Sequence, residues 1–103
     1  MRPVKNFGFK KYTYRNHAQL RMFERNIITD DVEDVIEYGE KIEDYPNDKP
    51  YPSCLIFKII NNRPVHVVVA INKSTSEGII ITLYEPAIDK FESDYKTRKK
   101  KKP

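Results

Sequence analysis

The sequence has little cysteine, histidine or glycine, and these shortages exclude several kinds of site. Its 103 residues contain one cysteine, Cys54, and two histidines. That is too few for an internal disulfide or for a zinc site built on thiolates. Its three glycines do not form a phosphate-binding loop, so a nucleotide hydrolase is unsupported. We therefore expect neither a metal nor a small-molecule cofactor. A magnesium site on the carboxylates of Glu43, Asp44 and Asp48 is the alternative, although exposed loop acids more often bind nothing specific.

Long apolar runs are missing as well. No stretch approaches the roughly 18 residues that a membrane span needs, and residues 1–11 lack the apolar core of a signal peptide. With the single thiol, this predicts a cytoplasmic protein that has no membrane partner. Hydrophobic residues make up 39% and charged residues 33%, a balance that fits one small domain over residues 1–103.

Charge is distributed unevenly along the chain. The formal net charge is +4, yet nine of the fifteen acids and a single base, Lys41, lie between Asp30 and Asp48. That segment carries −8 and the remainder +12. A basic body with one acidic flank predicts an anionic ligand such as RNA, and an ordinary solvated charge pattern is the alternative. The bases assigned to nucleic-acid binding are Lys10, Lys11, Arg63, Arg98, Lys99 and Lys100.

The apolar pattern predicts helices first and strands afterwards. Residues 14–26 contain no Gly or Pro. Residues 29–38 carry an apolar stripe with helical spacing, which predicts a helix with its acids on the outer face. Gly39 ends this helix. Strand patterns follow at 41–45, 54–60, 65–71 and 79–84. We predict an α+β fold in which two N-terminal helices pack on one face of a four-stranded antiparallel sheet.

Two flanking segments surround this predicted core of residues 14–86. Residues 1–13 are basic and aromatic and form an arm or a short strand. Residues 87–103 contain a short helix over 89–98 and a basic tail. The sequence contains no internal repeat.

The first helix places a polar strip between apolar stripes. His17, Arg21 and Glu24 share one narrow face, and Arg25 lies at its margin. Such a strip can hold charges against a cleft. The alternative is an ordinary surface ion pair between Arg21 and Glu24 beside a solvated histidine.

The second histidine, His66, lies near the start of the predicted central strand. If that strand and the last one are antiparallel neighbours, His66 stands near Thr82 or Tyr84. A buried, hydrogen-bonded structural histidine is the alternative interpretation. Cys54 is predicted to pack as a small apolar residue.

These residue types suit RNA cleavage without a metal. Attack by the 2′-hydroxyl needs a base, cations that hold the phosphate, and an acid for the departing 5′-oxygen. Histidine titrates in the useful range, arginine binds phosphate oxygens in pairs, and tyrosine donates a proton or stacks on a base. The predicted catalytic residues are His17, Arg21, Arg25, His66 and Tyr84, with either histidine as base or acid.

Several spaced motifs resemble one protein family over residues 17–86. The motifs are His17-Ala18-x-x-Arg21-Met22-x-Glu24-Arg25, Asp31-Val32-Glu33-x-Val35-Ile36-x-x-Gly39-Glu40, Ile42-Glu43-x-Tyr45-Pro46-x-Asp48, Pro52-Ser53-Cys54-Leu55, Arg63-Pro64-x-His66-Val67-Val68 and Thr82-x-Tyr84-x-Pro86. Their order and spacing resemble domain-of-unknown-function family 4258, which is grouped with RelE/ParE-like toxins of type II toxin–antitoxin systems. The resemblance implies a RelE/ParE toxin-like fold of two helices and four antiparallel strands, and a small zinc-finger antitoxin as partner.

The resemblance leaves the activity open, because RelE-like relatives are ribonucleases and ParE-like ones act differently. The first hypothesis is a toxin that acts as a metal-independent endoribonuclease, including on ribosome-associated mRNA. The second is a non-catalytic module of the same fold that binds nucleic acid or protein, and a third is a toxin that has lost its activity. Convergence of the five predicted catalytic residues on one concave surface would favour the first.

Overall fold

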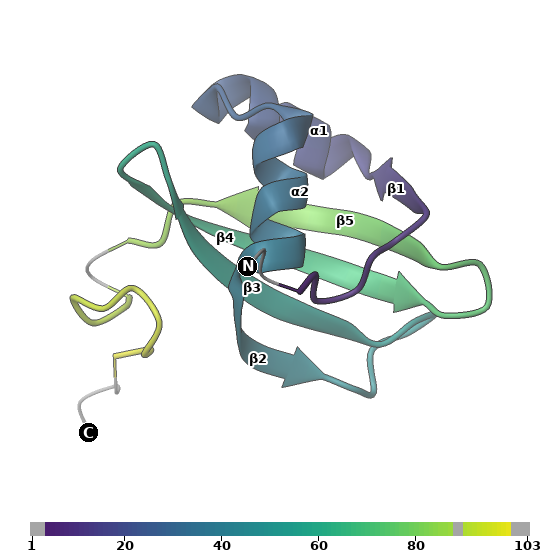
Figure 1. The fold of residues 1–103 in the computed structure, drawn as a ribbon. Coiled ribbons are helices and arrows are strands. Elements are labelled where there is room, and N and C mark those ends of the chain that lie inside the picture. The colour runs from purple at the N-terminus through teal and green to yellow at the C-terminus, as the bar shows by residue number, and fades with distance from the viewer. Residues whose placement is uncertain (1–3, 88–89, 100–103) are drawn as a thin grey trace.

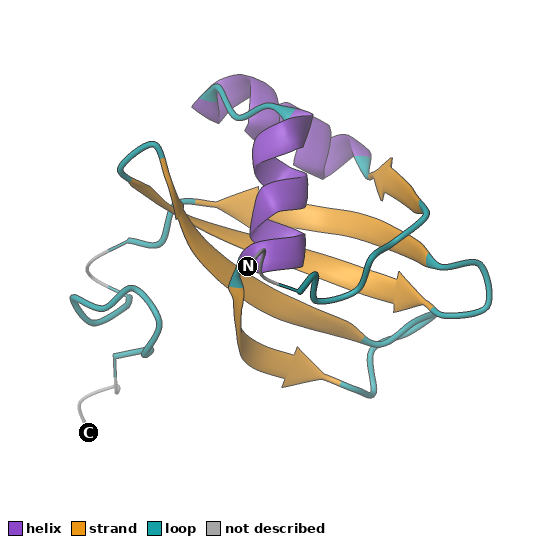
Figure 2. Cartoon of the chain, viewed as in Figure 1, coloured by secondary structure: helices purple, strands orange, loops and turns teal. Residues whose placement is uncertain are grey.

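The computed structural model describes residues 4–87 and 90–99 (Figure 1). Two helices and five strands make up this part of the chain, as Figure 2 shows by colour. In chain order they are β1 (Lys11–Tyr14), α1 (Asn16–Arg25), α2 (Thr29–Tyr38), β2 (Glu40–Tyr45), β3 (Ser53–Ile60), β4 (Arg63–Asn72) and β5 (Glu77–Tyr84). Neither helix has the length and apolar character needed to cross a membrane within the described ranges.

The five strands form one mixed sheet in the order β1-β5-β4-β3-β2. Strands β2 to β5 are antiparallel neighbours, whereas β1 pairs in parallel with β5. The prediction of a four-stranded antiparallel sheet is therefore wrong, although the α+β class is right. The predicted arm or strand at 1–13 supplies the extra edge strand. Four residues give too little alternation to reveal a strand, and the partner of Lys11 is the distant Glu77.

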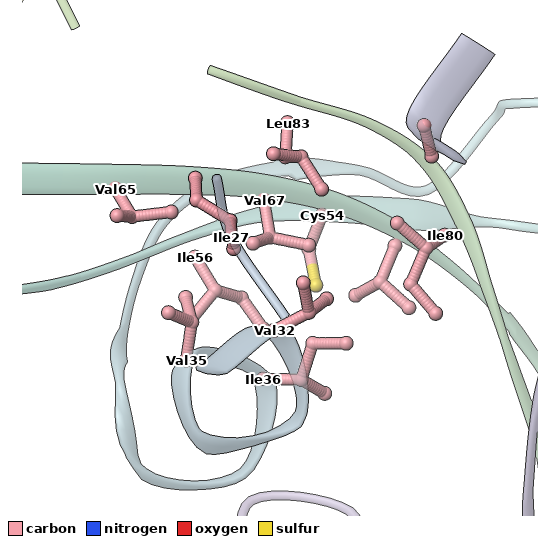
Figure 3. Packing of buried hydrophobic residues seen from close by; sticks show 12 residues of the cluster. Ile27, Val32, Val35, Ile36, Cys54, Ile56, Val65, Val67, Ile80 and Leu83 are labelled. Atoms are coloured by element: carbon pink, nitrogen blue, oxygen red, sulfur yellow. The ribbon is translucent and has the colours of Figure 1, made fainter. Parts of the chain in front are cut away.

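Both helices pack on the same face of the sheet (Figure 1). Helix α2 lies across the sheet and buries Val32, Val35 and Ile36, while α1 packs against β5 through Ala18. Figure 3 shows the three α2 side chains meeting apolar residues of three strands. The strand residues are Cys54, Ile56, Val65, Val67, Val69, Ile80 and Leu83. Burial raises the pKa of the Cys54 thiol to about 11, consistent with its predicted packing role.

Gly39 allows the end of α2 to approach β3 closely. A Cβ atom there would lie 2.4 Å from the Val35 carbonyl oxygen and 2.6 Å from the Phe57 carbonyl oxygen. We expect Gly39→Ala to lower the free energy of unfolding by about 3 kcal/mol, because the backbone on both sides would have to move. Urea unfolding measures this loss. Lys41→Ala, an exposed change in the same strand region, should cost less than about 0.5 kcal/mol, and equal losses would contradict the close-approach argument.

The segment before β1 is fastened to the end of α2 by Glu37. The carboxylate of Glu37 accepts backbone N–H groups of Phe7 at 2.8 Å, Gly8 at 2.8 Å and Phe9 at 3.1 Å, and also the Tyr12 hydroxyl. Only 2% of Glu37 is exposed. The expectation that every acid of this helix lies on a solvated outer face is thus wrong for Glu37, the only Asp, Glu, Lys or Arg that is buried among the described residues.

The C-terminal segment, residues 90–99, is not helical. It folds back on itself through an isolated antiparallel bridge between Phe91 and Arg98. The carboxylate of Asp94 accepts the backbone N–H groups of Lys96 and Thr97, at 2.9 and 3.0 Å, and these bonds hold a turn where a helix was predicted. Residues 88–89 and the tail from Lys100 onward lie outside the described residues.

Candidate active site

The five predicted catalytic residues lie on opposite sides of the sheet. His66 of β4 is directly opposite Tyr84 of β5 in the strand register. Their neighbours Val67 and Leu83 point toward the helices and the core, so His66 and Tyr84 point to the other face. His17, Arg21 and Arg25 belong to α1, on the helical face. The structure brings two of the five together and leaves three elsewhere.

The α1 residues form ordinary surface contacts. Arg21 pairs with Glu24 at 3.4 Å, with both side chains well exposed, and His17 is exposed. The backbone carbonyl of Arg25 accepts a hydrogen bond from the Arg63 guanidinium, which also pairs with Glu85 at 2.7 Å. These contacts agree with the surface-pair alternative for this helix.

His66 is completely buried beneath the C-terminal segment. Its Nε2 lies 2.6 Å from the backbone carbonyl oxygen of Tyr95, and its Nδ1 lies 3.4 Å from the hydroxyl oxygen of Tyr84. A carbonyl only accepts, so Nε2 carries the proton and Nδ1 is free to accept the Tyr84 hydroxyl. The rings of Phe57 and Phe91 pack edge-on against the imidazole.

The protonation of His66 follows from this environment. Burial lowers the pKa of the imidazole, and the nearby Arg98 charge lowers it further. The Tyr95 carbonyl and the Glu43 carboxylate raise this pKa, but burial outweighs them. His66 is therefore neutral near pH 7, with one ring nitrogen turned toward Tyr84.

Arg98 connects the C-terminal segment to β2. Its guanidinium binds both carboxylate oxygens of Glu43, at 2.7 and 3.2 Å, and lies 5.0 Å from the centre of the Phe91 ring. The Tyr45 hydroxyl donates to the same carboxylate. The Arg98 hydrogen bonds, aided by Tyr45, hold the pKa of Glu43 below its usual value despite burial. Glu43 is thus an ionised carboxylate whose charge is balanced by Arg98.

Tyr84 borders a pocket of about 320 Å³ beside this ion pair. Burial raises the pKa of the Tyr84 hydroxyl, and the Arg98 charge opposes that rise only in part. Tyr84 therefore keeps its proton at neutral pH and can donate it. The pocket is lined by Tyr84, Glu85, Ala87, Lys90, Phe91 and Arg98.

Sequence reasoning assigned Arg98 to nucleic-acid binding, considered Glu43 only as a magnesium ligand, and gave Tyr45 no role. Glu43 and Tyr45 both lie in the motif Ile42-Glu43-x-Tyr45-Pro46-x-Asp48. They are two residues apart, which places both side chains on the same side of a strand, and this spacing is the signal that could have found them. Their meeting with Arg98, 55 residues further along, was not visible in the sequence.

The other predicted nucleic-acid-binding residues are dispersed. Lys10 and Lys11 lie exposed at the β1 edge, and Lys99 lies exposed beside the pocket residue Lys90, whose carbonyl accepts its N–H. Lys100 lies outside the described residues. Within residues 4–87 and 90–99, no three His, Cys, Asp or Glu side chains gather in a way that could hold a metal ion.

The model of one protein family, a domain of unknown function designated DUF4258, matches residues 14–85. The chain belongs to the DUF4258 family. The matched range of this DUF4258 domain includes Glu43, His66 and Tyr84, whereas Arg98 and the rest of the C-terminal segment follow it. No curated protein and no solved structure matches the chain. The family match provides no link to RelE/ParE-like toxins, so that assignment remains a prediction.

Proposed function

We propose that this DUF4258 domain binds RNA and cleaves it without a metal at the surface formed by Glu43, Tyr84 and Arg98. The observation that carries the proposal is their convergence from β2, β5 and the C-terminal segment on the face of the sheet away from the helices. A carboxylate, a protonated tyrosine and a guanidinium are the groups that 2′-hydroxyl chemistry needs.

Cations at the pocket supply the phosphate contacts. Arg98 and Lys90 both line it, and Lys90 has no ion-pair partner among the described residues. A guanidinium can hold two phosphate oxygens as it now holds the two oxygens of Glu43. An RNA phosphate that replaces Glu43 on Arg98 would leave the carboxylate free to act.

The proposed cleavage has two proton transfers. Glu43, released from Arg98, takes the proton of the 2′-hydroxyl as the 2′-oxygen attacks phosphorus. Tyr84 turns its O–H from His66 Nδ1 toward the RNA and gives this proton to the 5′-oxygen as the P–O5′ bond breaks. The products are a 2′,3′-cyclic phosphate and a free 5′-hydroxyl. Solvent then returns a proton to Tyr84 and removes one from Glu43, so the enzyme is restored.

His66 acts in this proposal as a positioning residue. Its Nδ1 accepts from the Tyr84 hydroxyl, and its Nε2–H donates to the Tyr95 carbonyl. These two bonds orient Tyr84 and fasten the C-terminal segment that carries Arg98. Because the imidazole is fully buried, it does not contact RNA in this arrangement.

The proposal predicts RNA cleavage in excess chelator. Labelled single-stranded RNA, free and on translating ribosomes, is incubated with the protein and the products are separated on gels. We expect fragments with cyclic phosphate ends, and a 2′-deoxy nucleotide at the cut site should block cleavage because the attacking oxygen is gone. Intact RNA under both conditions would rule out the ribonuclease.

A non-catalytic binding module is the second candidate. It is favoured by the observation that Arg98 and Glu43 already neutralise each other and that both His66 nitrogens are engaged. In that case the same RNA is retained without turnover, and its affinity falls steeply as salt rises because phosphate contacts release counterions. The toxin–antitoxin setting is a further part of the proposal, supported by the resemblance of the sequence motifs.

A further inference from the structure

Two aromatic rings of the N-terminal segment are stacked against the start of β5. The rings of Phe7 and Phe9 are nearly parallel, 10° apart, and their centres are 4.7 Å from each other. Phe9 lies on Gly78, where a Cβ atom would be 2.6 Å from Cδ2 and 2.7 Å from Cε2 of the ring. Phe9 therefore has the β5 backbone on one side and Phe7 on another. Phe7, which is half-buried, is the outer ring of the stack.

The backbone that carries these rings is firmly held where it passes the end of α2 (Figure 1). The carboxylate of Glu37 accepts the N–H groups of residues 7–9. The side-chain amide of Asn6 donates two hydrogen bonds of 2.9 Å to backbone carbonyl groups at the end of α2. Gly8 has a φ of 63°, which lets successive N–H groups turn toward one anion. The rings are thus positioned before a ligand arrives, so binding orders little of the chain.

A hollow of about 260 Å³ opens beside the two rings. It is lined by Asn6, Phe7, Phe9, Ile71, Lys73 and Ser76. Pockets for drug-sized ligands are about 300–1,000 Å³, so this one fits a single planar ring system. Two polar groups remain for such a ring. No hydrogen bond among the described residues uses the amide oxygen of Asn6, and the Ser76 hydroxyl, which accepts from the Lys10 N–H, keeps its own proton to donate.

The charges at the rim of this hollow are positive. Lys73 lines it and is exposed in the turn between β4 and β5. Lys10 is attached to Ser76 through its N–H at 2.8 Å, so its exposed ammonium can reach the rim. Neither lysine forms an ion pair within residues 4–87 and 90–99. None of the six lining residues is acidic.

Two acids belong to segments that border this site, and neither faces it. Glu37 is buried and is directed to the backbone N–H groups that it accepts. Glu77, the first residue of β5, accepts the Thr13 hydroxyl. Because the next residue, Gly78, lies under Phe9 on the helical face, Glu77 points to the other face of the sheet. An anionic group beside the hollow therefore meets ammonium groups.

We propose that this hollow is a base-binding site for single-stranded RNA, in which one nucleobase stacks on Phe7 and the adjoining phosphates bind Lys73 and Lys10. Stacking on aromatic side chains beside a basic surface is the usual way to hold a single strand, and it tolerates any base. The site deepens the proposed function and rests on it only in taking RNA as the ligand. It lies at the first residues of β5 on the helical face, whereas Tyr84 ends β5 on the other face, so the bound base is remote from the cut.

Two other occupants fit less well. An aromatic side chain of a protein partner has the right shape, but it brings no negative charge for the two lysines. A second copy of the chain would bring its own lysine-bordered hollow toward Lys73, which like charges oppose. A nucleotide supplies both the planar ring and the phosphates.

Affinity for uncleavable RNA tests the site separately from cleavage. The probe is a fluorescent strand of twelve 2′-O-methyl adenosines, which keeps the bases and phosphates and lacks the attacking hydroxyl. Phe7→Leu should weaken binding at least about fivefold, the lower end of what one stacked base contributes. Phe7→Tyr keeps the ring and should bind within about twofold of wild type. Lys73→Ala should weaken binding about threefold and reduce the slope of log K against log salt by about 0.7.

Matched variants and a second readout separate this role from general effects. Phe23→Leu makes the same change at a Phe that is 87% exposed on α1, and Lys41→Ala removes an exposed lysine of β2. Both should leave affinity within about twofold. Amide shifts caused by the probe should centre on residues 7–9 and Ser76. At saturating unmodified RNA, Phe7→Leu should cleave within about twofold of the wild-type rate, because the site is remote from the cut.

Several outcomes would overturn the base-binding site: failure of the probe to bind wild type, unchanged affinity in Phe7→Leu, or an equal loss in Phe23→Leu. Amide shifts at the hollow with a tryptophan-containing peptide and none with the probe would assign it to a protein partner instead. Because Phe7 packs on Phe9, thermal midpoints are measured as well. Lys73→Ala changes an exposed turn residue and should melt with wild type, so its weaker binding would reflect the site and not the fold.

Failure of the proposed cleavage gives a different result. Unmodified RNA then stays intact, while the probe still binds and Phe7→Leu still weakens it. That combination supports the base-binding site and removes the ribonuclease.

Discussion

Tyr84→Phe should slow RNA cleavage about 100-fold or more, because removing a positioned general acid commonly costs 10²- to 10⁴-fold. The ring remains, so its tilted contact with His66 is kept and the fold should persist. Only the hydroxyl is lost, and with it the proton for the 5′-oxygen. Single-turnover cleavage of labelled RNA measures the rate, and filter binding measures affinity, which should change less than threefold.

Controls distinguish this role from a general weakening of the protein. Arg98→Ala should reduce both cleavage and affinity, because it removes a phosphate contact and leaves Glu43 without its ion-pair partner. Arg21→Ala, on the helical face, should leave cleavage within about twofold. If Tyr84→Phe cleaves at the wild-type rate while Arg21→Ala does not, the assignment of the site to this face is wrong.

The second large effect concerns stability: Glu37→Ala should lower the free energy of unfolding by about 3 kcal/mol. The change leaves three backbone N–H groups and the Tyr12 hydroxyl without their acceptor. Chemical denaturation measures the loss. Hydrogen exchange should show faster exchange at Phe7, Gly8 and Phe9 than in the core strands. Asp44→Ala, in an exposed pair, is the matched control and should cost less than about 0.5 kcal/mol.

The same carboxylate gives the stability a defined pH dependence. Burial alone would raise the pKa of Glu37, but the Tyr12 hydroxyl and the backbone N–H groups of Gly8, Phe7 and Phe9 outweigh it and hold the pKa below the usual 4.5. The stabilisation is therefore complete above pH 4.5 and is lost as pH falls through the lower folded-state pKa. The difference in the free energy of unfolding between wild type and Glu37→Ala should become smaller in acid. A gap that is constant from pH 7 to pH 3 would contradict the proposed network.

Strong local patterns made much of the fold predictable. The apolar spacing of α2 and the alternation in β3, β4 and β5 gave these elements nearly their observed bounds, and the antiparallel placement of His66 opposite Tyr84 followed from them. The helices do pack on one face, as expected. These features arise from contacts close in sequence or from hairpin turns.

The features that were not predicted depend mainly on contacts between residues far apart in the sequence. Strand β1 is stabilised by pairing with β5. The C-terminal segment forms a turn and not a helix, because the Asp94 carboxylate accepts nearby backbone N–H groups. His17 and Arg21 do belong to one helix, as their spacing predicted. Periodicity does not say which side of the sheet a helix covers, so it could not show that α1 lies on the side away from His66 and Tyr84. The ion pair of Glu43 with Arg98 joins segments that no local pattern relates.

The parallel pairing of β1 with β5 also affects the order in which the protein can form during synthesis. Lys10 donates its N–H to Ser76, 66 residues later. At the usual rate of about 5–20 residues per second, the ribosome delivers that partner roughly 3–13 s after the N-terminal segment. Over this interval β1 has no strand to join, and α1 lacks β5, the strand on which it packs. The first strand of the nascent chain therefore stays unpaired until almost the whole domain has been made. During this delay the segment is accessible to chaperones and proteases.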